Sequence, residues 1–221
     1  MLSDHRLFLQ QYFRDFHATG AIAPSSRWLA AALARFVPGD GRQSGVNPPR
    51  QILEVGPGTG AVTRSIVSAL GPEDRLDLVE LNGSFVEHLH HRFRKEPDFA
   101  AVSDRVRVLH QKVEELPPTS VYDAIVSGLP LNNFAVADVE RILETFSRLL
   151  APGGTLSFFE YVAVRPARAM VSGASDRQRL RRIGQRLGDL LGKHEFRREC
   201  IWRNLPPAWV HHVRIRPGTL S

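Results

Sequence analysis

Short apolar runs alternate with amphipathic segments through the middle of the chain. Five apolar runs have the length of β-strands, and they cover residues 51–55, 75–81, 106–111, 122–128 and 155–164. Three segments between them carry apolar residues at helical spacing, and they cover residues 58–70, 83–95 and 138–150. Continuous apolar strands separated by helices are typical of a parallel sheet whose two faces are both covered.

The N-terminal part adds helices before the first strand. Residues 4–18 and 27–37 each have a helical pattern, and residues 38–49 are rich in Pro and Gly, as in a linker. The sequence therefore predicts an N-terminal helical appendage at 1–37 and one α/β domain at 38–221.

One more helix and two strands are predicted after the fifth strand. The helix at 175–192 has one apolar face, made by Leu180, Ile183, Leu187 and Leu191. Strands at 196–202 and 209–215 flank the turn NLPPA and are expected to pair. The sequence thus predicts an α/β fold whose mostly parallel, seven-stranded sheet ends in a C-terminal antiparallel hairpin.

Composition limits where such a protein works. Cys200 is the one cysteine among 221 residues, so no disulfide framework is expected and a reducing compartment is the simpler interpretation. The first residues, MLSDHRLFLQ, do not read as a signal peptide, and no apolar run reaches transmembrane length. We expect a cytoplasmic protein, or one attached to the inner face of the cell membrane.

Charge is divided unevenly along the chain. Residues 164–221 hold 13 Lys and Arg against 4 Asp and Glu, whereas residues 1–163 hold 16 against 19. A basic C-terminal quarter indicates a polyanionic partner, either nucleic acid or an anionic lipid surface. Charge alone does not choose between them.

A glycine-rich loop is expected where the first strand turns into a helix. Residues 54–60 read EVGPGTG, which lets the backbone approach a ligand closely, and Glu80 ends the second strand where a carboxylate can bind ribose hydroxyls. The loop sequence by itself is also compatible with two other interpretations: a turn that serves packing only, and an NAD site. The acidic Glu54, the turn APGG at 151–154 and the closing hairpin favour S-adenosylmethionine over a pyrophosphate.

Five stretches carry a resemblance to a known family: TGAIAPSS, LEVGPGTGAVT, VSGLPLNNF, APGGTLSFFEYVAVRP and RNLPPAWV. Together they resemble the bacterial phospholipid N-methyltransferases and the related ornithine lipid N-methyltransferases, which are class I, Rossmann-like, S-adenosylmethionine-dependent enzymes. The resemblance implies S-adenosylmethionine as cofactor, S-adenosylhomocysteine as product, and an amino lipid as acceptor.

Site residues are expected from the resemblance and from the residue patterns themselves, and they fall into four groups. Cofactor contacts are expected from Glu54, Gly56, Pro57, Gly58, Thr59, Gly60, Glu80, Leu81, Val113, Glu114, Ser127 and Gly128. Acceptor contacts are expected from Ile22, Ser25, Ser26, Leu129, Pro130, Leu131, Asn132 and Arg165. Candidate catalytic residues, which would position the amine or help to remove its proton, are Tyr161, Glu160 and Asn133. Membrane contacts are expected from Leu9, Tyr12, Phe13, Phe16, Arg179 and Arg182.

Two departures from the family pattern concern the ligand. Residues 111–113 read Gln-Lys-Val where many relatives have a Gly-Asp-Ala type of segment, so adenine contact is expected from the backbone near Val113, with Glu114. Glu160 stands where a less charged residue is expected, which indicates an altered head group.

The loop SGLPLNNF bears on the choice of acceptor. Methyltransferases that act on nucleic-acid bases need an aromatic face to stack the base, whereas Leu131 follows Pro130 here. The function expected first is therefore methylation of phosphatidylethanolamine towards phosphatidylcholine; ornithine lipid N-methylation is the alternative, and ribosomal RNA adenine N6-dimethylation a further one. A non-enzymatic binding module would be indicated by a broken cofactor loop, but EVGPGTG is intact.

Partners follow from the same features. An anionic membrane surface is expected to receive the N-terminal apolar stripe and the Arg-rich helix at 175–192, although both segments also suit ordinary packing against the domain. No nucleic acid or metal is expected, since His88 and His91 share a helical face without a further converging ligand.

Overall fold

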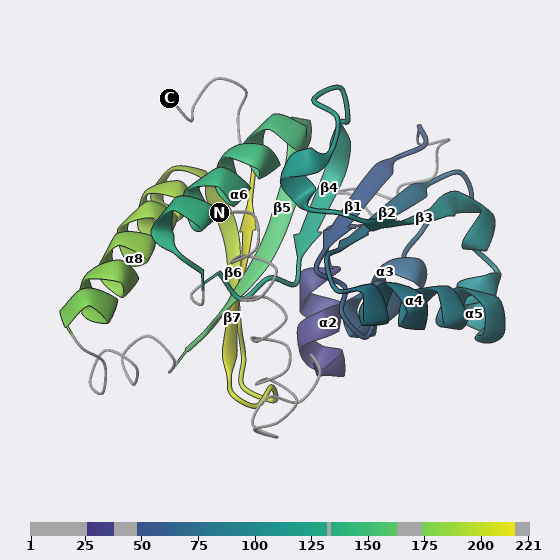
Figure 1. The fold of residues 1–221 in the computed structure, drawn as a ribbon, viewed down its shortest axis with the longest axis horizontal. Coiled ribbons are helices and arrows are strands. Elements are labelled where there is room, and N and C mark those ends of the chain that lie inside the picture. Colours follow the sequence, from purple (N-terminus) through teal and green to yellow (C-terminus); the bar gives the residue numbers. More distant parts are fainter. Residues whose placement is uncertain (1–25, 38–47, 132–133, 163–173, 215–221) are drawn as a thin grey trace.

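The computed structural model describes residues 26–37, 48–131, 134–162 and 174–214 (Figure 1). Within them, seven strands form one sheet in the order β3-β2-β1-β4-β5-β7-β6. Strands β1 to β5 are parallel, and β7 pairs antiparallel with both β5 and β6. The strands are β1 (Gln51–Val55), β2 (Arg75–Glu80), β3 (Val106–His110), β4 (Tyr122–Ser127), β5 (Leu150–Tyr161), β6 (Glu195–Ile201) and β7 (Ala208–Val213).

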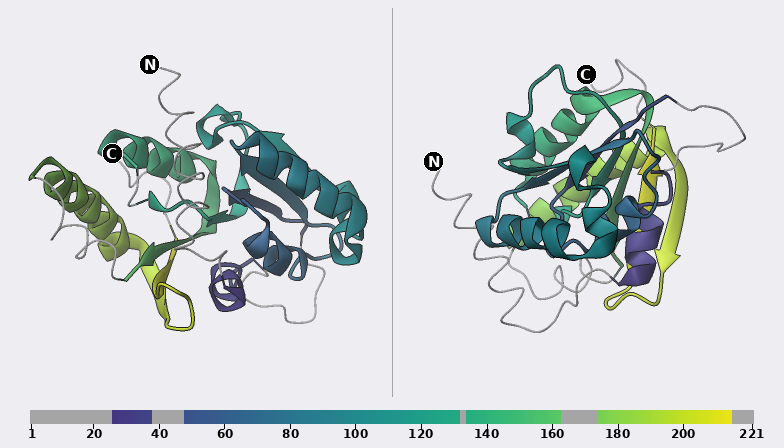
Figure 2. Two further views of the ribbon diagram at one scale, coloured as in Figure 1. Left: turned by 60° about the horizontal axis from the view of Figure 1, so that its bottom comes forward. Right: turned by 90° about the vertical axis from the view of Figure 1, so that its right-hand side faces the viewer.

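Helices cover both faces of this sheet, as the sequence pattern predicts (Figure 2). They are α2 (Arg27–Leu33), α3 (Ala61–Val67), α4 (Gly83–Lys95), α5 (Pro97–Ala100), α6 (Val136–Leu149) and α8 (Ala174–His194), with the 3-10 turns η1 (Ser103–Arg105) and η2 (Val113–Glu115). Apolar side chains of α6 and α8 form one core with the sheet, and those of α2, α3 and α4 form the other. The predicted fold class is confirmed.

Each helix is held by the buried face that its sequence spacing predicts. On α8, Ile183, Leu187 and Leu190 are buried, with Leu191 packed against the same core. On α2, Leu29 and Leu33 have no exposed surface and share a core with Phe159 of β5. Helix α2 therefore packs on the sheet domain, although we assigned it to the N-terminal appendage.

Element boundaries differ from the prediction at a few points. The helix expected at 58–70 begins only after Gly60, whose φ of +78° lies in the left-handed region, and spans Ala61–Val67. The helix expected at 27–37 continues as turns beyond Leu33. The turn expected at 151–154 lies inside β5, where the pairing with β4 shifts register. The predicted helix at 4–18 lies outside the described residues, as does most of the linker at 38–49.

Parallel pairing sets the position of the site. The carboxyl ends of β1, β2, β4 and β5 lie at one edge of the sheet, and in such folds ligands bind in the crevice outside these ends. Because Ala208 pairs with Tyr161, the end of the β6–β7 hairpin lies at this same edge.

Candidate active site

The loop that follows β1 touches the loop that follows β4. The Gly56 amide donates to the Val79 carbonyl oxygen at 2.9 Å, and the Gly128 amide donates to the Val55 carbonyl oxygen at 2.8 Å. A Cβ on Gly128 would lie 2.6 Å from the Gly56 carbonyl oxygen. Glycine at position 128 thus allows a backbone contact that no other residue would permit without a shift.

Glu80, the last residue of β2, holds the middle of the glycine loop. Its buried carboxylate accepts hydrogen bonds from the Gly58 amide at 3.0 Å and the Asn82 amide at 2.8 Å. Burial raises the pKa of this carboxyl, against the lowering effect of the two amides. Gly58 has a φ of +55°, and a Cβ there would meet no atom within 4 Å. Open space therefore borders the loop beside a carboxylate that can accept bonds from hydroxyl groups.

A cleft of about 570 Å³, including its open mouth, runs along this edge of the sheet. Six residues of its wall were predicted from the sequence: Gly56, Glu80, Leu81, Val113, Glu114 and Leu129. Phe134, Asp138 and Ile142 contribute to the wall from α6 and the turn before it. Asp138 and Ile142 lie one helical turn apart on the face of α6 that meets the sheet. No local sequence pattern indicated that these two residues would border the cleft.

Glu54 lies apart from this wall. Its side chain has no exposed surface, and neither carboxylate oxygen has a hydrogen-bond partner among the described residues. Burial raises the pKa of this carboxyl to about 8; Glu80 also raises the pKa, while Thr63 and Arg92 lower it. The carboxyl is enclosed beneath the loop, and contact of Glu54 with the cofactor stays a prediction.

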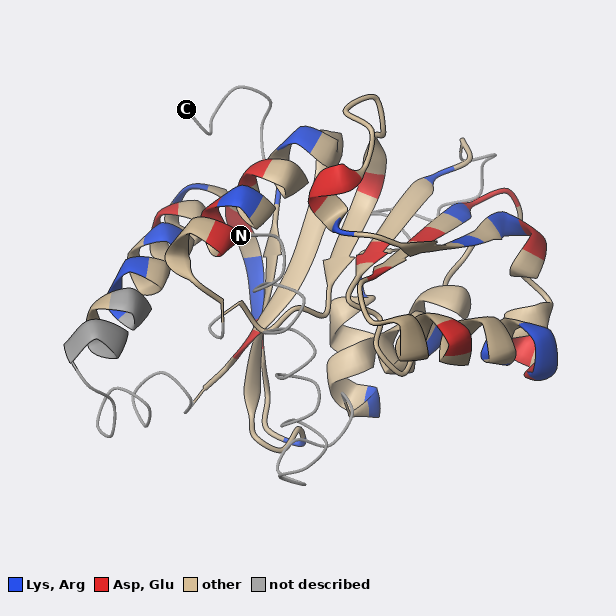
Figure 3. Ribbon diagram, in the orientation of Figure 1, with Lys and Arg blue, Asp and Glu red and all other residues tan. Residues whose placement is uncertain are grey.

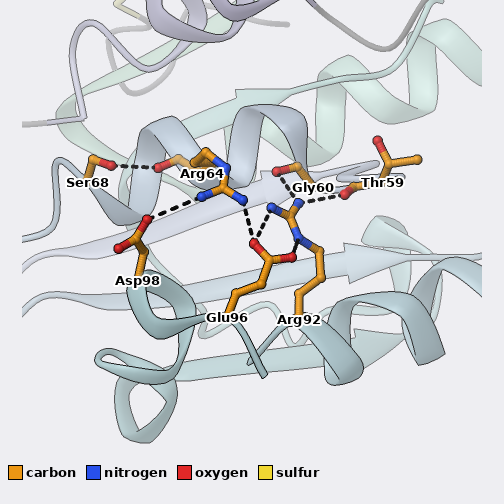
Figure 4. Close-up of polar contacts among 7 residues, drawn as sticks. All are labelled: Thr59, Gly60, Arg64, Ser68, Arg92, Glu96 and Asp98. Atoms are coloured by element: carbon orange, nitrogen blue, oxygen red, sulfur yellow. Dashed lines mark hydrogen bonds and ion pairs between the residues drawn. The ribbon is translucent and has the colours of Figure 1, made fainter. Parts of the chain in front are cut away.

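Arg92 of α4 binds the end of the glycine loop (Figure 4). Its Nη1 donates to the carbonyl oxygens of Thr59 at 2.7 Å and Gly60 at 2.9 Å. Its Nε and Nη2 donate to Glu96 at 2.6 and 3.0 Å, and the guanidinium lies 4.0 Å from the centre of the Phe99 ring. The sequence analysis missed this residue, although its position three residues after the buried Leu89 places it on the apolar face of α4.

Comparison with known proteins identifies the family to which this chain belongs. A sequence profile described as "Methyltransferase domain" matches residues 52–154. The chain is 30% identical over 156 residues to an ornithine lipid N-methyltransferase from Singulisphaera acidiphila. The aligned region covers 71% of this chain and 77% of the relative. The chain belongs to the class I S-adenosylmethionine-dependent methyltransferases. The family inferred from the motifs is thereby confirmed.

Solved methyltransferase structures share the fold of this methyltransferase. The magnesium protoporphyrin IX methyltransferase of Synechocystis PCC 6803, with bound S-adenosylmethionine, has a TM-score of 0.58 at 13% identity and covers 86% of this chain and 79% of its own. The O-methyltransferase TomG of Streptomyces achromogenes, also in complex with S-adenosylmethionine, has a TM-score of 0.55 at 16% identity and covers 90% of this chain and 95% of its own. S-adenosylmethionine is the cofactor, as predicted.

The site of this methyltransferase has room and polar groups for that cofactor. The open side of Gly58 and the carboxylate of Glu80 adjoin at the carboxyl edge, and the cleft continues to the η2 turn at Val113. Pro57 is buried, and its carbonyl oxygen accepts from the Gly60 amide at 2.8 Å, which closes the loop.

The loop after β4 places its residues differently from the expectation. Ser127 is buried, and its hydroxyl accepts from the Leu129 amide at 3.3 Å. Leu129 and Pro130 are half-buried. Leu131 is 1% exposed and belongs to the core under α6, so its side chain is not a contact for an acceptor. Phe134 is buried in the same core and also borders the cleft.

The two candidates at the end of β5 lie on opposite faces of the sheet. Tyr161 packs against the α2–α3 core, with its ring 5.1 Å from that of Phe159. Glu160 lies on the other face, where Oε2 is 3.7 Å from Nε2 of the buried His211. Nδ1 of His211 is 2.6 Å from Glu195, so two carboxylates and one imidazole adjoin there. Tyr161 and Glu160 therefore do not converge on one point.

Several predicted residues lie outside the described part of the chain. They are Ile22, Ser25, Asn132 and Arg165 for the acceptor site, Asn133 for catalysis, and Leu9, Tyr12, Phe13 and Phe16 for the membrane. Arg179 lies on α8 but its side chain is likewise outside the described ones, whereas Arg182 is exposed. Ser26 serves as the N-cap of α2, since its hydroxyl accepts from the Leu29 amide at 3.2 Å.

His88 and His91 are exposed on α4, and no group of three potential metal ligands occurs among the described residues. No helix in the described ranges is both long enough and apolar enough to cross a bilayer.

Proposed function

We propose that this methyltransferase transfers methyl groups from S-adenosylmethionine to the amine of ornithine lipid. The observation that carries the proposal is the 30% identity to an ornithine lipid N-methyltransferase over 71% of this chain. The sequence motifs alone led us to expect phosphatidylethanolamine, but that acceptor is not confirmed, and the relative favours our alternative. The two lipids share an alkyl amine, so the same site chemistry applies to both.

Cofactor binding in this proposal rests on the loop and cleft. Glu80 accepts bonds from the ribose hydroxyls, and the loop around Gly58 lets the backbone come close to the ligand. The turn at Val113 borders the adenine. When bound, S-adenosylmethionine supplies a methyl group that its positive sulfonium makes reactive.

The residues near the acceptor have to bring a neutral amine in line with that methyl group. An alkyl ammonium has a pKa of about 10, so it loses its proton before its lone pair forms the new N–C bond. Tyr161 stands at the carboxyl edge and is our candidate to orient the amine, whose proton passes to water. Glu160 is the second candidate, with the His211 and Glu195 pair behind it as a place to hold a proton.

A lipid amine also suits the loop after β4. A flipped nucleic-acid base must be stacked on an aromatic face, and the residue after Pro130 is an aliphatic side chain buried in the core. An amine without a ring needs only small groups and carbonyl oxygens around it, which Gly128 and Leu129 provide.

Methyl transfer from labelled S-adenosylmethionine to separate acceptors tests the proposal. The acceptors are vesicles with ornithine lipid, vesicles with phosphatidylethanolamine, and ribosomal RNA; the Glu80→Gln variant is the control for cofactor-dependent transfer. We expect label on ornithine lipid. Label on phosphatidylethanolamine alone would keep the reaction and replace the head group, whereas label on RNA alone, or on no acceptor by a protein that binds S-adenosylmethionine, would overturn the proposal.

A further inference from the structure

The turn between β6 and β7 exposes large apolar side chains. Trp202 is 70% exposed and Leu205 is 79% exposed, and Trp28 at the start of α2 is 41% exposed. These three are among the five large apolar side chains that the described residues expose. The other two, Val121 and Phe196, stand at the starts of β4 and β6, which lie at the opposite edge of the sheet.

Arginines and a buried amide fix this cluster in place. The guanidinium of Arg27 lies 4.6 Å from the centre of a Trp28 ring, and that of Arg203 lies 4.9 Å from it. Asn204 is 4% exposed, and its Oδ1 accepts from the Ser26 amide at 3.1 Å, which ties the hairpin to α2. Both arginines are exposed. The exposed apolar side chains therefore lie on a turn that is hydrogen-bonded to α2, and the two arginines place positive charge beside them.

The cluster stands next to the acceptor end of the active site. Tyr161 pairs with Ala208 at the end of β5, and the Val162 amide donates to the Pro207 carbonyl oxygen at 2.9 Å. Two views show α2 beside the β6–β7 hairpin at this end of the molecule (Figure 2). A surface that docks here would lie beside Tyr161, at the carboxyl end of β5.

We propose that Trp28, Trp202 and Leu205, with Arg27 and Arg203, form a docking surface for an anionic lipid bilayer. The partner is chosen by the combination of groups: tryptophan is enriched at membrane interfaces, an exposed leucine gains from leaving water, and arginines attract anionic head groups. The proposal rests on the proposed function, because it places the bilayer that would hold the acceptor against the acceptor end of the site.

The shape of the cluster favours a bilayer over a folded partner. A stable protein interface buries about 800 Å² on each side, and a cluster of three apolar side chains offers much less than such a face. A bilayer accepts a narrow apolar tip, since the lipids rearrange around it. Basic positions also lie on α8, which packs on the face of the sheet opposite to α2 (Figure 3).

Vesicle binding by the full chain tests the surface. We would compare the wild type with the double variant Trp202→Gln and Leu205→Gln, and with Val121→Gln, a matched control at the other edge of the sheet. The vesicles hold phosphatidylcholine with or without phosphatidylglycerol. We expect the double variant to lose roughly tenfold or more in affinity for the anionic vesicles, and the control to bind like the wild type. Unchanged binding by a folded double variant would overturn the inference.

A second measurement needs no variant. Two of the protein's three tryptophans lie in the cluster, so lipids brominated in the acyl chain should quench its fluorescence when it binds anionic vesicles. No quenching by vesicles that do bind the protein would contradict the inference. The inference would also be contradicted if the double variant lost RNA binding or self-association but kept its affinity for vesicles.

Measurements of lipid methylation, in detergent and in vesicles, distinguish a failure of this inference from a failure of the proposed function. If ornithine lipid dispersed in detergent is methylated equally by the wild type and the double variant, and only the vesicle reaction slows in the variant, both stand. If no lipid is methylated but the double variant still loses vesicle binding, the docking surface stands and the acceptor is wrong. If methylation of lipid in vesicles is unchanged by the double substitution, the surface is wrong and the acceptor stands.

Discussion

Arg92 on α4 donates a hydrogen bond to the carbonyl oxygen of Gly60, 2.9 Å away at the end of the glycine loop. The two residues are held so closely that a Cβ on Gly60 would lie 2.5 Å from Nη1 of Arg92. Helix α4 begins three residues after Glu80, so its two ends lie beside the carboxylate and the loop that we propose to bind the cofactor. Arg92 is therefore a positioning residue for the loop.

Replacing Arg92 with Met should weaken both the fold and cofactor binding. The change removes the Arg92 donor from the carbonyl oxygens of Thr59 and Gly60, although the Gly60 oxygen keeps the Arg64 amide, and we expect a loss of roughly 2–4 kcal/mol in the free energy of unfolding. Urea unfolding and calorimetric titration with S-adenosylmethionine measure the two effects. Arg94→Met, at an exposed position of the same helix, is the control. An Arg92 variant that binds the cofactor with wild-type affinity would show that the loop does not depend on this contact.

Gly128→Ala should disrupt the contact between the two loops. Its new Cβ would lie 2.6 Å from the Gly56 carbonyl oxygen, which is backbone and does not yield as a flexible side chain would. We expect lower stability, and cofactor affinity reduced by roughly tenfold or more, since strain of this kind costs on the order of 1–3 kcal/mol. Gly188→Ala on α8 is the matched control, because its Cβ would meet nothing within 4 Å and alanine favours a helix by about 0.8–1 kcal/mol. Equal cofactor affinity in both variants would contradict the close approach.

Glu54 should make stability depend on pH. The folded protein keeps a proton on this carboxyl up to a pKa of about 8, whereas an exposed glutamate loses it near 4.5. The folded state therefore binds more protons than the unfolded state between these values, and the free energy of unfolding should fall as the pH rises from 4.5 to 8. Unfolding curves across this range should show a shallower fall for Glu54→Gln. An identical pH dependence in the two proteins would mean that Glu54 is ionised when buried.

The same carboxyl predicts proton release when the cofactor binds. S-adenosylmethionine carries an ammonium and a sulfonium, and a positive charge near Glu54 favours the ionised carboxylate. Calorimetry near neutral pH in buffers of different ionisation enthalpy would count the released protons. We expect release from the wild type and less from Glu54→Gln; equal release would assign the proton to another group.

Tyr161→Phe should lower kcat without changing the Kd for S-adenosylmethionine. The hydroxyl is proposed to act on the amine, not on the cofactor, and loss of such assistance typically costs about 10²–10⁴-fold in rate. Tyr122→Phe is the control, since its hydroxyl donates to Asp77 at 2.7 Å, at the start of β4 and away from the cleft. Full turnover by Tyr161→Phe would leave Glu160 as the remaining candidate at the end of β5.

Local patterns predicted much of this molecule. Strands β1, β2, β4 and β5 stand out because each is an apolar run buried over most of its length, and α4 was predicted with its observed bounds because Leu89 and Phe93 define its buried face. The glycine loop and Glu80 were predictable because strand-to-helix turns at this edge of a parallel sheet repeat the same chemistry.

Contacts between distant segments were the part that the sequence did not reveal. Leu131 looked like a loop residue, but α6 folds over it and buries it in the core. Asp138 and Ile142 reach the cleft only because α6 crosses that edge. The tie between Ser26 and Asn204 joins residues 178 positions apart, and no local periodicity encodes such a pair.

The most direct test of the proposed function is a competition between acceptors. Vesicles that contain equal amounts of ornithine lipid and phosphatidylethanolamine are incubated with the full chain and S-adenosylmethionine, and the lipid products are identified by mass spectrometry. The proposal predicts that methylated ornithine lipid appears first, and that Glu80→Gln forms little of it. Methylated phosphatidylethanolamine as the main product, or no methylated lipid from a protein that binds its cofactor, would contradict it.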